Sequence, residues 1–194
     1  MKALHRTGQC IALLGLLAAP AATVRAQEIC QFDTARSQVH FTLGDVLHTV
    51  HGNFQLQQGS SVLFKRKTGE MSGMINVDAT SGVSGNGMRD RRMTRDELKS
   101  EKFSLISFVP SHFDGTLQQG GMSALKVQGQ FTLLGSAHPL TLDMHVRLDG
   151  NACHVEGSFA LPYVAWGLKD PSTLILRVNK EVQIDLSLEG KLQQ

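Results

Sequence analysis

The chain has 194 residues, of which 41% are hydrophobic and 19% are charged. Its 19 basic residues are nearly balanced by 17 acidic residues and form no long basic run, which argues against a nucleic-acid partner. The length suits one domain with one core, because no linker, internal repeat or low-complexity tract marks a second domain.

Residues 1–26 have the pattern of a cleaved signal peptide. Lys2 and Arg6 form a basic head, residues 11–22 are apolar, and Val24-Arg25-Ala26 resembles a peptidase site. The apolar run is shorter than the roughly 20 residues that cross a bilayer, so we expect no membrane span. Cleavage removes three basic residues and leaves 16 basic against 17 acidic ones. We therefore expect an exported protein, periplasmic or secreted.

Residues 27–194 are expected to form one all-β domain, because alternation of apolar and polar residues recurs along them. The alternation predicts eight strands, over residues 37–43, 50–57, 71–80, 104–113, 125–133, 140–148, 152–160 and 180–189. Turns rich in Gly, Asn and Asp separate the strands. The spacing is typical of an antiparallel barrel or sandwich. We favour the barrel, because closure leaves no exposed sheet edge.

The charged segment 86–102 interrupts the strand pattern and predicts one or two short helices over a barrel mouth or flank. Thr94 and Glu97 have the spacing of a capping box. The segment also carries four arginines, which could bind a phosphate in a bidentate manner or could lie on a solvated helical face. The arginines are Arg89, Arg91, Arg92 and Arg95.

Cys30 and Cys153 are the two cysteines beyond the signal segment, and in an oxidising compartment they permit one disulfide; two unpaired thiols are the alternative. The histidines His40, His48 and His51 suggest a metal site, but their spacing reproduces no short zinc motif, so we expect no metal. The sequence also lacks a nucleophile elbow and a phosphate-binding loop, so we expect no enzyme.

The chain resembles the YceI-like family through an ordered succession of segments. They are VHFTLGDVLHTVHGNF at 39–54, GEMSGMINVDATSGVSGNGMRDRRM at 69–93, VQGQFTLLGSAHPLTL at 127–142, YVAWGLKDPSTLILRV at 163–178 and VQIDLSL at 182–188. The resemblance implies an extended, eight-stranded, lipocalin-like antiparallel barrel with a helical insertion and an apolar lumen. It also implies a long-chain ligand such as a polyisoprenoid, an isoprenoid quinone or another fatty-acid-like lipid, without a further cofactor.

From the alternation and this resemblance we predict two groups of site residues. The predicted lumen wall consists of Phe41, Leu43, Phe54, Ile75, Val77, Phe108, Phe131, Leu133, Leu142, Met144 and Phe159. The predicted head-group contacts at the mouth are His48, His51, Arg89, Asp90 and Trp166. Trp166 and Tyr163 suit a mouth or a barrel corner equally well. The alternatives are an exported enzyme or metal-binding protein that uses the His48/His51 region, or a barrel packed solid. The sequence leaves a homodimer open.

Overall fold

The computed structural model describes residues 27–45, 47–172 and 177–193. The predicted signal peptide, residues 1–26, lies outside the described residues, as do Val46, residues 173–176 and Gln194. The elements are β1 (Glu28–Phe32), β2 (Gln38–Gly44), β3 (Thr49–Leu56), β4 (Ser61–Phe64), β5 (Met71–Val83), α1 (Gly87–Arg91), the π-helical turn η1 (Arg92–Glu97), β6 (Leu105–Asp114), β7 (Met122–Leu133), β8 (Ser136–Asp149), β9 (Ala152–Leu161) and β10 (Val182–Gln193).

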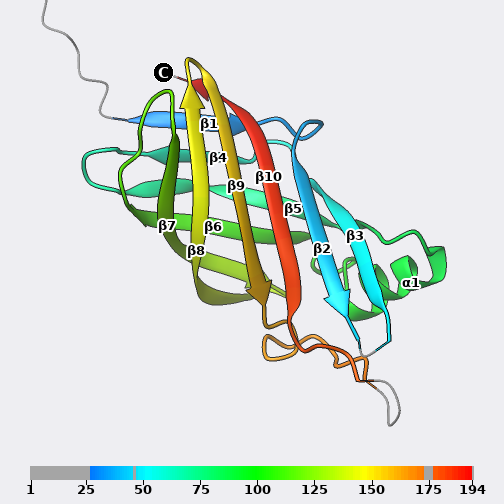
Figure 1. Cartoon of the computed structure of the whole chain (residues 1–194). Helices are drawn as coiled ribbons and strands as arrows, with labels where there is room; N and C mark the ends of the chain where they lie inside the picture. The colour runs from blue at the N-terminus through cyan, green and yellow to red at the C-terminus, as the bar shows by residue number, and fades with distance from the viewer. Residues whose placement is uncertain (1–26, 46, 173–176, 194) are drawn as a thin grey trace, which may run out of the picture.

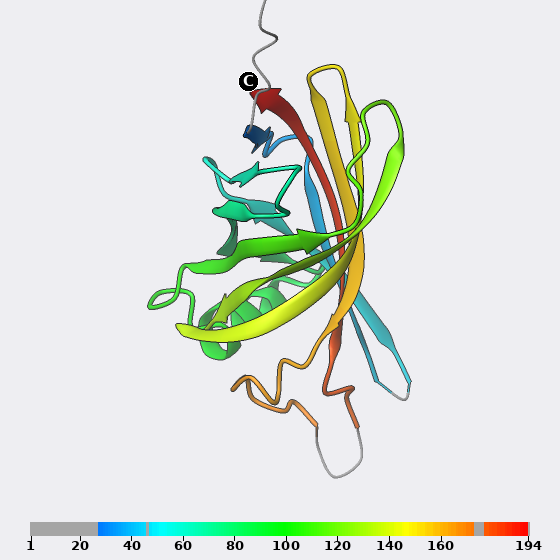
Figure 2. The same ribbon diagram turned by 90° about the vertical axis from the view of Figure 1, so that its left-hand side faces the viewer.

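Eight long strands form a closed antiparallel ring, which confirms the predicted barrel. The ring runs β2-β3-β5-β6-β7-β8-β9-β10 and closes through the β10–β2 pair. Each of these strands forms backbone hydrogen bonds with a neighbour on both sides, so the wall is continuous. Figures 1 and 2 show the long strands wrapping around a common axis.

Two short strands that the sequence did not predict, β1 and β4, complete the wall at one end. Residues 183–187 of β10 pair with β2, whereas residues 190–193 pair with β1. In the same way, β5 pairs with β4 through residues 71–74 and with β3 from residue 77 onward. At this end β1 and β4 therefore take the places that β2 and β3 occupy at the other end (Figure 1).

Inward and outward side chains alternate along the strands as the sequence predicts. On β7, Leu125 and Val127 are buried, and the neighbouring Lys126 and Gln128 are exposed. On β8, Leu142 and Met144 are buried in the same pattern. The buried side chains point to the interior of the barrel, so the alternation identifies the residues that surround its axis.

The insertion is helical, but the predicted capping box is wrong. Asn86 is the N-cap residue of α1, and its side chain accepts hydrogen bonds from the backbone N–H groups of Met88 and Arg89. Thr94 lies inside the π-helical turn, and its hydroxyl donates to the carbonyl of Asp90 over 2.9 Å. Because α1 runs directly into η1, Thr94 meets no free N-terminus that it could cap.

Cys30 and Cys153 form a disulfide between β1 and β9, with their Cα atoms 6.2 Å apart. Both cysteines are 2% exposed. The sequence left their pairing open, and the structure joins them. Within the part of the chain that the structure describes, no helix is long and apolar enough to cross a membrane.

Candidate ligand-binding lumen

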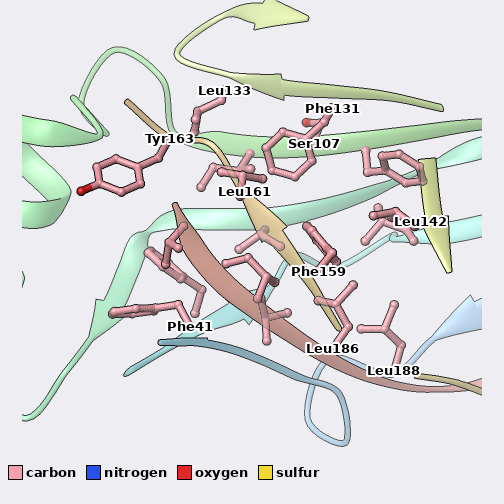
Figure 3. Close-up of a pocket in the computed structure, with 18 of the residues that line it drawn as sticks. Phe41, Ser107, Phe131, Leu133, Leu142, Phe159, Leu161, Tyr163, Leu186 and Leu188 are labelled. Atoms are coloured by element: carbon pink, nitrogen blue, oxygen red, sulfur yellow. The ribbon is translucent and has the colours of Figure 1, made fainter. Parts of the chain in front are cut away.

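A cavity of about 430 Å³ runs inside the barrel, within the range of small-molecule sites. All eleven residues of the predicted lumen wall line it. They are Phe41, Leu43, Phe54, Ile75, Val77, Phe108, Phe131, Leu133, Leu142, Met144 and Phe159. Figure 3 shows Phe131, Leu142, Phe159 and Leu186 reaching into the same space from different strands. The interior is thus hollow and not packed solid.

The sequence analysis missed part of the wall. At the end that carries the disulfide, Phe32 and Phe64 come from the unpredicted strands β1 and β4. At the other end, Met93 and Leu98 come from the insertion and Leu168 from the segment that follows β9. Strand alternation is a weak signal in segments as short as β1 and β4, and it carries no information on the inward face of a helix or loop.

Polar side chains meet the cavity at this second end, which we call the mouth. The mouth cluster comprises Ser84, Arg89, Arg92, Glu97, Tyr163 and Lys169. The first four come from the end of β5 and the helical insertion, and the last two from the segment after β9. An amphiphile with its chain along the lumen could therefore place its polar end here.

Arg89 is held by the backbone and side chain of Ser84. Its Nε donates to the Ser84 hydroxyl and its Nη2 donates to the Ser84 carbonyl, each over 2.7 Å. Asp90 accepts from the backbone N–H of Ser84 over 2.9 Å and also from its hydroxyl. Arg89 and Asp90, both predicted as head-group contacts, thus both hydrogen-bond to Ser84. Of the two, only Arg89 lines the cavity.

Glu97 is the acidic side chain of the mouth cluster. Its Oε1 lies 3.9 Å from Arg92 Nε, at the edge of ion-pair distance. Its Oε2 is buried and has no hydrogen-bond partner among the described residues. The sequence analysis considered Glu97 only as part of a capping box; in the structure Glu97 lines the cavity, with 18% of its side chain exposed.

Tyr163 follows β9 and contacts Asn179, which lies shortly before β10. Its hydroxyl donates to the carbonyl of Asn179 over 2.7 Å. Burial, together with the negative charges of Asp170 and Glu97, raises the pKa of Tyr163 to about 12. The phenol is therefore neutral at physiological pH and remains a hydrogen-bond donor.

His48 and His51 lie outside the cavity. The His48 side chain is 75% exposed at the tip of the β2–β3 hairpin, 3.8 Å from the Asp45 carboxylate. The pKa of Asp45 is lowered because it accepts hydrogen bonds from the backbone N–H groups of Leu47 and His48. His51 shares a hydrogen bond with Thr42 on the outer face of the hairpin. The structure therefore does not bring these histidines together with Arg89.

Trp166 also lies outside the cavity wall. Its ring stacks on His138, with centroids 4.4 Å apart and planes 5° apart, and its centroid lies 5.6 Å from that of the Phe131 ring. Trp166 thus fixes the segment after β9 to the start of β8. Of the predicted head-group residues, Arg89 alone lines the cavity, and the head-group role of the others stays a prediction.

His40 points outward from β2, as its strand position predicts, and its Nε2 is 3.1 Å from the Gln38 side chain. Throughout residues 27–45, 47–172 and 177–193, no group of three or more His, Cys, Asp or Glu side chains is arranged to hold a metal ion.

The YceI-like domain matches residues 31–190 of the chain. Among solved structures, Burkholderia cenocepacia BcnA is similar with a TM-score of 0.65 and 21% identity, over 84% of this chain and 100% of BcnA. A polyisoprenoid binding domain from Saccharophagus degradans, implicated in plant cell wall breakdown, has a TM-score of 0.64 and 16% identity, over 87% of this chain and 99% of that domain.

The YceI protein of Campylobacter jejuni has a TM-score of 0.54 and 11% identity, over 98% of this chain and 94% of the other. No curated protein matches the chain. The structural likenesses show a shared fold, and the domain match covers most of the described barrel. The chain therefore belongs to the YceI-like family.

Proposed function

We propose that this protein is a non-enzymatic binding protein that holds one long apolar chain, such as a polyisoprenoid or the tail of an isoprenoid quinone, inside its barrel. The observation that most supports this proposal is the continuous apolar cavity inside the barrel. The printed description of the similar Saccharophagus degradans domain as polyisoprenoid binding supports it.

The energetics favour a ligand held mainly by its hydrocarbon part. Burial contributes about 0.8 kcal/mol per methylene group, so about ten such groups contribute about 8 kcal/mol before association costs. One hydrogen bond contributes about 1 kcal/mol net. The wall would therefore supply most of the affinity, and the mouth cluster would orient the ligand and select its head group.

We also propose that the protein acts in an oxidising compartment outside the cytoplasm, as a carrier or store. The signal-peptide pattern of residues 1–26 and the Cys30–Cys153 disulfide support this location, because structural disulfides persist mainly in such compartments. The alternative of an enzyme or metal site around His48 and His51 gains no support, because both lie away from the cavity.

Mass spectrometry of lipids extracted from the natively purified protein tests the proposal. We expect one long-chain lipid per protein. A Leu142→Trp variant should lose most of this lipid, because Leu142 is 4% exposed and faces the cavity. The neighbouring Thr141 is exposed on the outer face of β8, so Thr141→Trp is the matched control and should keep the lipid.

Near-ultraviolet circular dichroism checks that both variants are folded. Equal lipid content in the wild type and a folded Leu142→Trp variant would contradict binding in the lumen. Failure of the wild type to bind any long-chain lipid, either as purified or after addition, would contradict the proposed function itself.

A further inference from the structure

The two ends of the lumen differ in their exposure to water. At the mouth, the cavity is lined by Arg92 and Lys169, which are both exposed. At the end that carries the disulfide, it is lined by Phe32, Phe64 and Phe113, each at most 5% exposed. Among the residues that the structure describes, the lumen thus meets water at the mouth, and we call the disulfide end its blind end.

The loop between β6 and β7, residues 115–121, lies at this blind end. Its Leu117 lines the cavity and packs against the core cluster that contains both cysteines. The Gln119 side chain donates to the carbonyl of Gly150, in the turn between β8 and β9, over 3.2 Å. That turn and β1 lie at the same end of the barrel in Figure 1. The loop thus brings an apolar side chain to the end of the lumen.

Arg66, in the turn between β4 and β5, holds this loop in place. Its Nη1 donates to the Leu117 carbonyl over 3.4 Å, and its Nη2 donates to the Gln119 side chain over 3.2 Å. Its Nε and Nη2 also donate to the two carboxylate oxygens of Glu28 on β1. Such a two-point contact fixes the orientation of a guanidinium group. One arginine therefore joins β1, the β4–β5 turn and the loop that carries Leu117.

The connection between β6 and β7 is longer than the pairing of these strands requires. Their last ladder pair joins Asp114 to Lys126, so residues 115–125 lie outside the ladder between them. Hairpin loops usually have about two to five residues. The extra residues pack against the protein, because the Ser123 hydroxyl accepts from the backbone N–H of Gln118 over 2.9 Å and Ser123 is 3% exposed. The excess length thus covers the blind end.

The volume of the cavity limits how much of a chain it can bury. A water molecule takes up about 30 Å³ in the liquid and a methylene group has a similar size, so a cavity of about 430 Å³ takes on the order of 15 methylene groups. A longer chain that enters from the mouth meets Leu117 at the blind end. Its remaining carbons then stay in water outside the mouth, where they gain no burial.

We infer that Leu117, positioned by Arg66, is the floor of the lumen and sets the length of hydrocarbon chain that the barrel can bury. This inference rests on the proposed function and specifies the chain length of its ligand. The affinity should rise by up to about fourfold for each added methylene group until the chain end reaches Leu117, and should then level off.

Saturated straight-chain fatty acids with 10 to 22 carbons, in steps of two, test the inference. Their affinities for the delipidated mature protein are measured by competition with a fluorescent fatty acid, below the critical micelle concentration of each acid. We expect the wild-type affinity to reach a plateau within this series. The length at which the plateau begins is the measured quantity, and a change in overall stability does not by itself move it.

Two substitutions of Leu117 should move the plateau in opposite directions. Leu117→Ala removes three carbon atoms from the floor, so the plateau should begin two to four carbons later. Acids longer than the wild-type limit should then bind about tenfold more tightly. Leu117→Trp fills the end of the lumen, so its plateau should begin at a shorter chain. Thr116→Ala and Thr116→Trp are the matched controls, because the neighbouring Thr116 is exposed, and both should keep the wild-type plateau.

Arg66→Met tests the positioning role of the guanidinium. It keeps the apolar stem of the side chain but releases the loop, so the plateau should begin at a longer chain than in the wild type. Lys65→Met is the matched control in the same turn, because Lys65 pairs with Glu70 and its side chain is 42% exposed. This control should keep the wild-type plateau.

A plateau at the same length in the wild type and in folded Leu117→Ala and Leu117→Trp variants would overturn the inference. A wild-type affinity that keeps rising through 22 carbons would overturn it as well, and this result needs no variant to fold. In both cases the acids still bind, so the lumen proposal survives. If neither these acids nor any isoprenoid binds, the proposed function itself fails.

Discussion

The Cys30–Cys153 disulfide crosses strand β10 on the inner side of the barrel. Cys30 on β1 is opposite Leu192 of β10, and Cys153 on β9 is opposite Gly190 of the same strand. A Cβ atom on Gly190 would lie 3.1 Å from Cys30 Sγ, so the bridge passes over this glycine. Both cysteines line the cavity. Strand β1, which carries Cys30, lies at the opposite end of the barrel from α1 (Figure 1). The disulfide thus joins β1 to β9 across the strand that lies between them.

Reduction of this disulfide should lower the free energy of unfolding by about 2–4 kcal/mol. The cysteines are 123 residues apart in sequence, and a long loop loses much conformational entropy when it is closed in the unfolded chain. Urea unfolding with and without a reductant measures the effect. A Cys30→Ala/Cys153→Ala variant should be insensitive to the reductant. An unfolding midpoint that is the same for oxidised and reduced wild type would contradict this prediction.

Gly190→Ala should destabilise the barrel by about 1–3 kcal/mol. The new Cβ would lie 2.6 Å from the backbone carbonyl oxygen of Gln31, which cannot move without displacing β1. Gly157→Ala is the matched comparison on β9, because its Cβ would meet first the flexible end of Met144, which can shift into the cavity. Thermal unfolding of the two variants should show the larger loss for Gly190→Ala. Equal losses would contradict this explanation.

The wall of the lumen was predictable because strand alternation is a local property of the sequence. Once strands are assigned, every second residue faces the interior, and Leu142, Met144 and Phe159 follow directly. The strands β1 and β4 escaped prediction because they have five and four residues. So short a segment contains at most two periods of the alternation, too few to stand out from chance.

The mouth was less predictable because it depends on contacts between distant segments. A charged helical residue such as Glu97 is expected to face water, and only the packing of η1 against the barrel turns it inward. The position of His48 and His51 outside the cavity also depends on how distant strands pair. Within the described chain, β3 pairs with β5 only from Asn53 onward, so the hairpin tip with His48 extends past the wall.

His138→Ala should weaken the attachment of the segment after β9 by about 1 kcal/mol, because it removes the ring that stacks on Trp166. Trp166 is the only tryptophan of the chain, so its fluorescence reports this contact directly. We expect a red shift of the emission as the ring gains exposure to water. An unchanged emission spectrum and unchanged stability would show that the stack does not hold the segment.

Tyr163 should titrate far above a free tyrosine and should make stability fall at high pH. It is the only tyrosine, is 6% exposed, and burial raises its pKa from 10.0 to about 12. Absorbance at 295 nm should therefore give a midpoint near 12 for the folded protein and near 10 in urea. A midpoint near 10 while the near-ultraviolet circular dichroism of the fold persists would contradict the assignment.

The direction of the stability change follows from proton binding. Between pH 10 and 12 the unfolded chain loses the tyrosine proton while the folded chain keeps it. The contribution of Tyr163 is thus complete below pH 10 and is lost as the pH rises toward 12. Tyr163→Phe should cost about 1–2 kcal/mol at neutral pH, because the Asn179 carbonyl loses its donor. The difference in unfolding free energy between wild type and Tyr163→Phe should then shrink as the pH rises from 10 to 12. A difference that stays constant over this range would show that the fold does not protect the phenol.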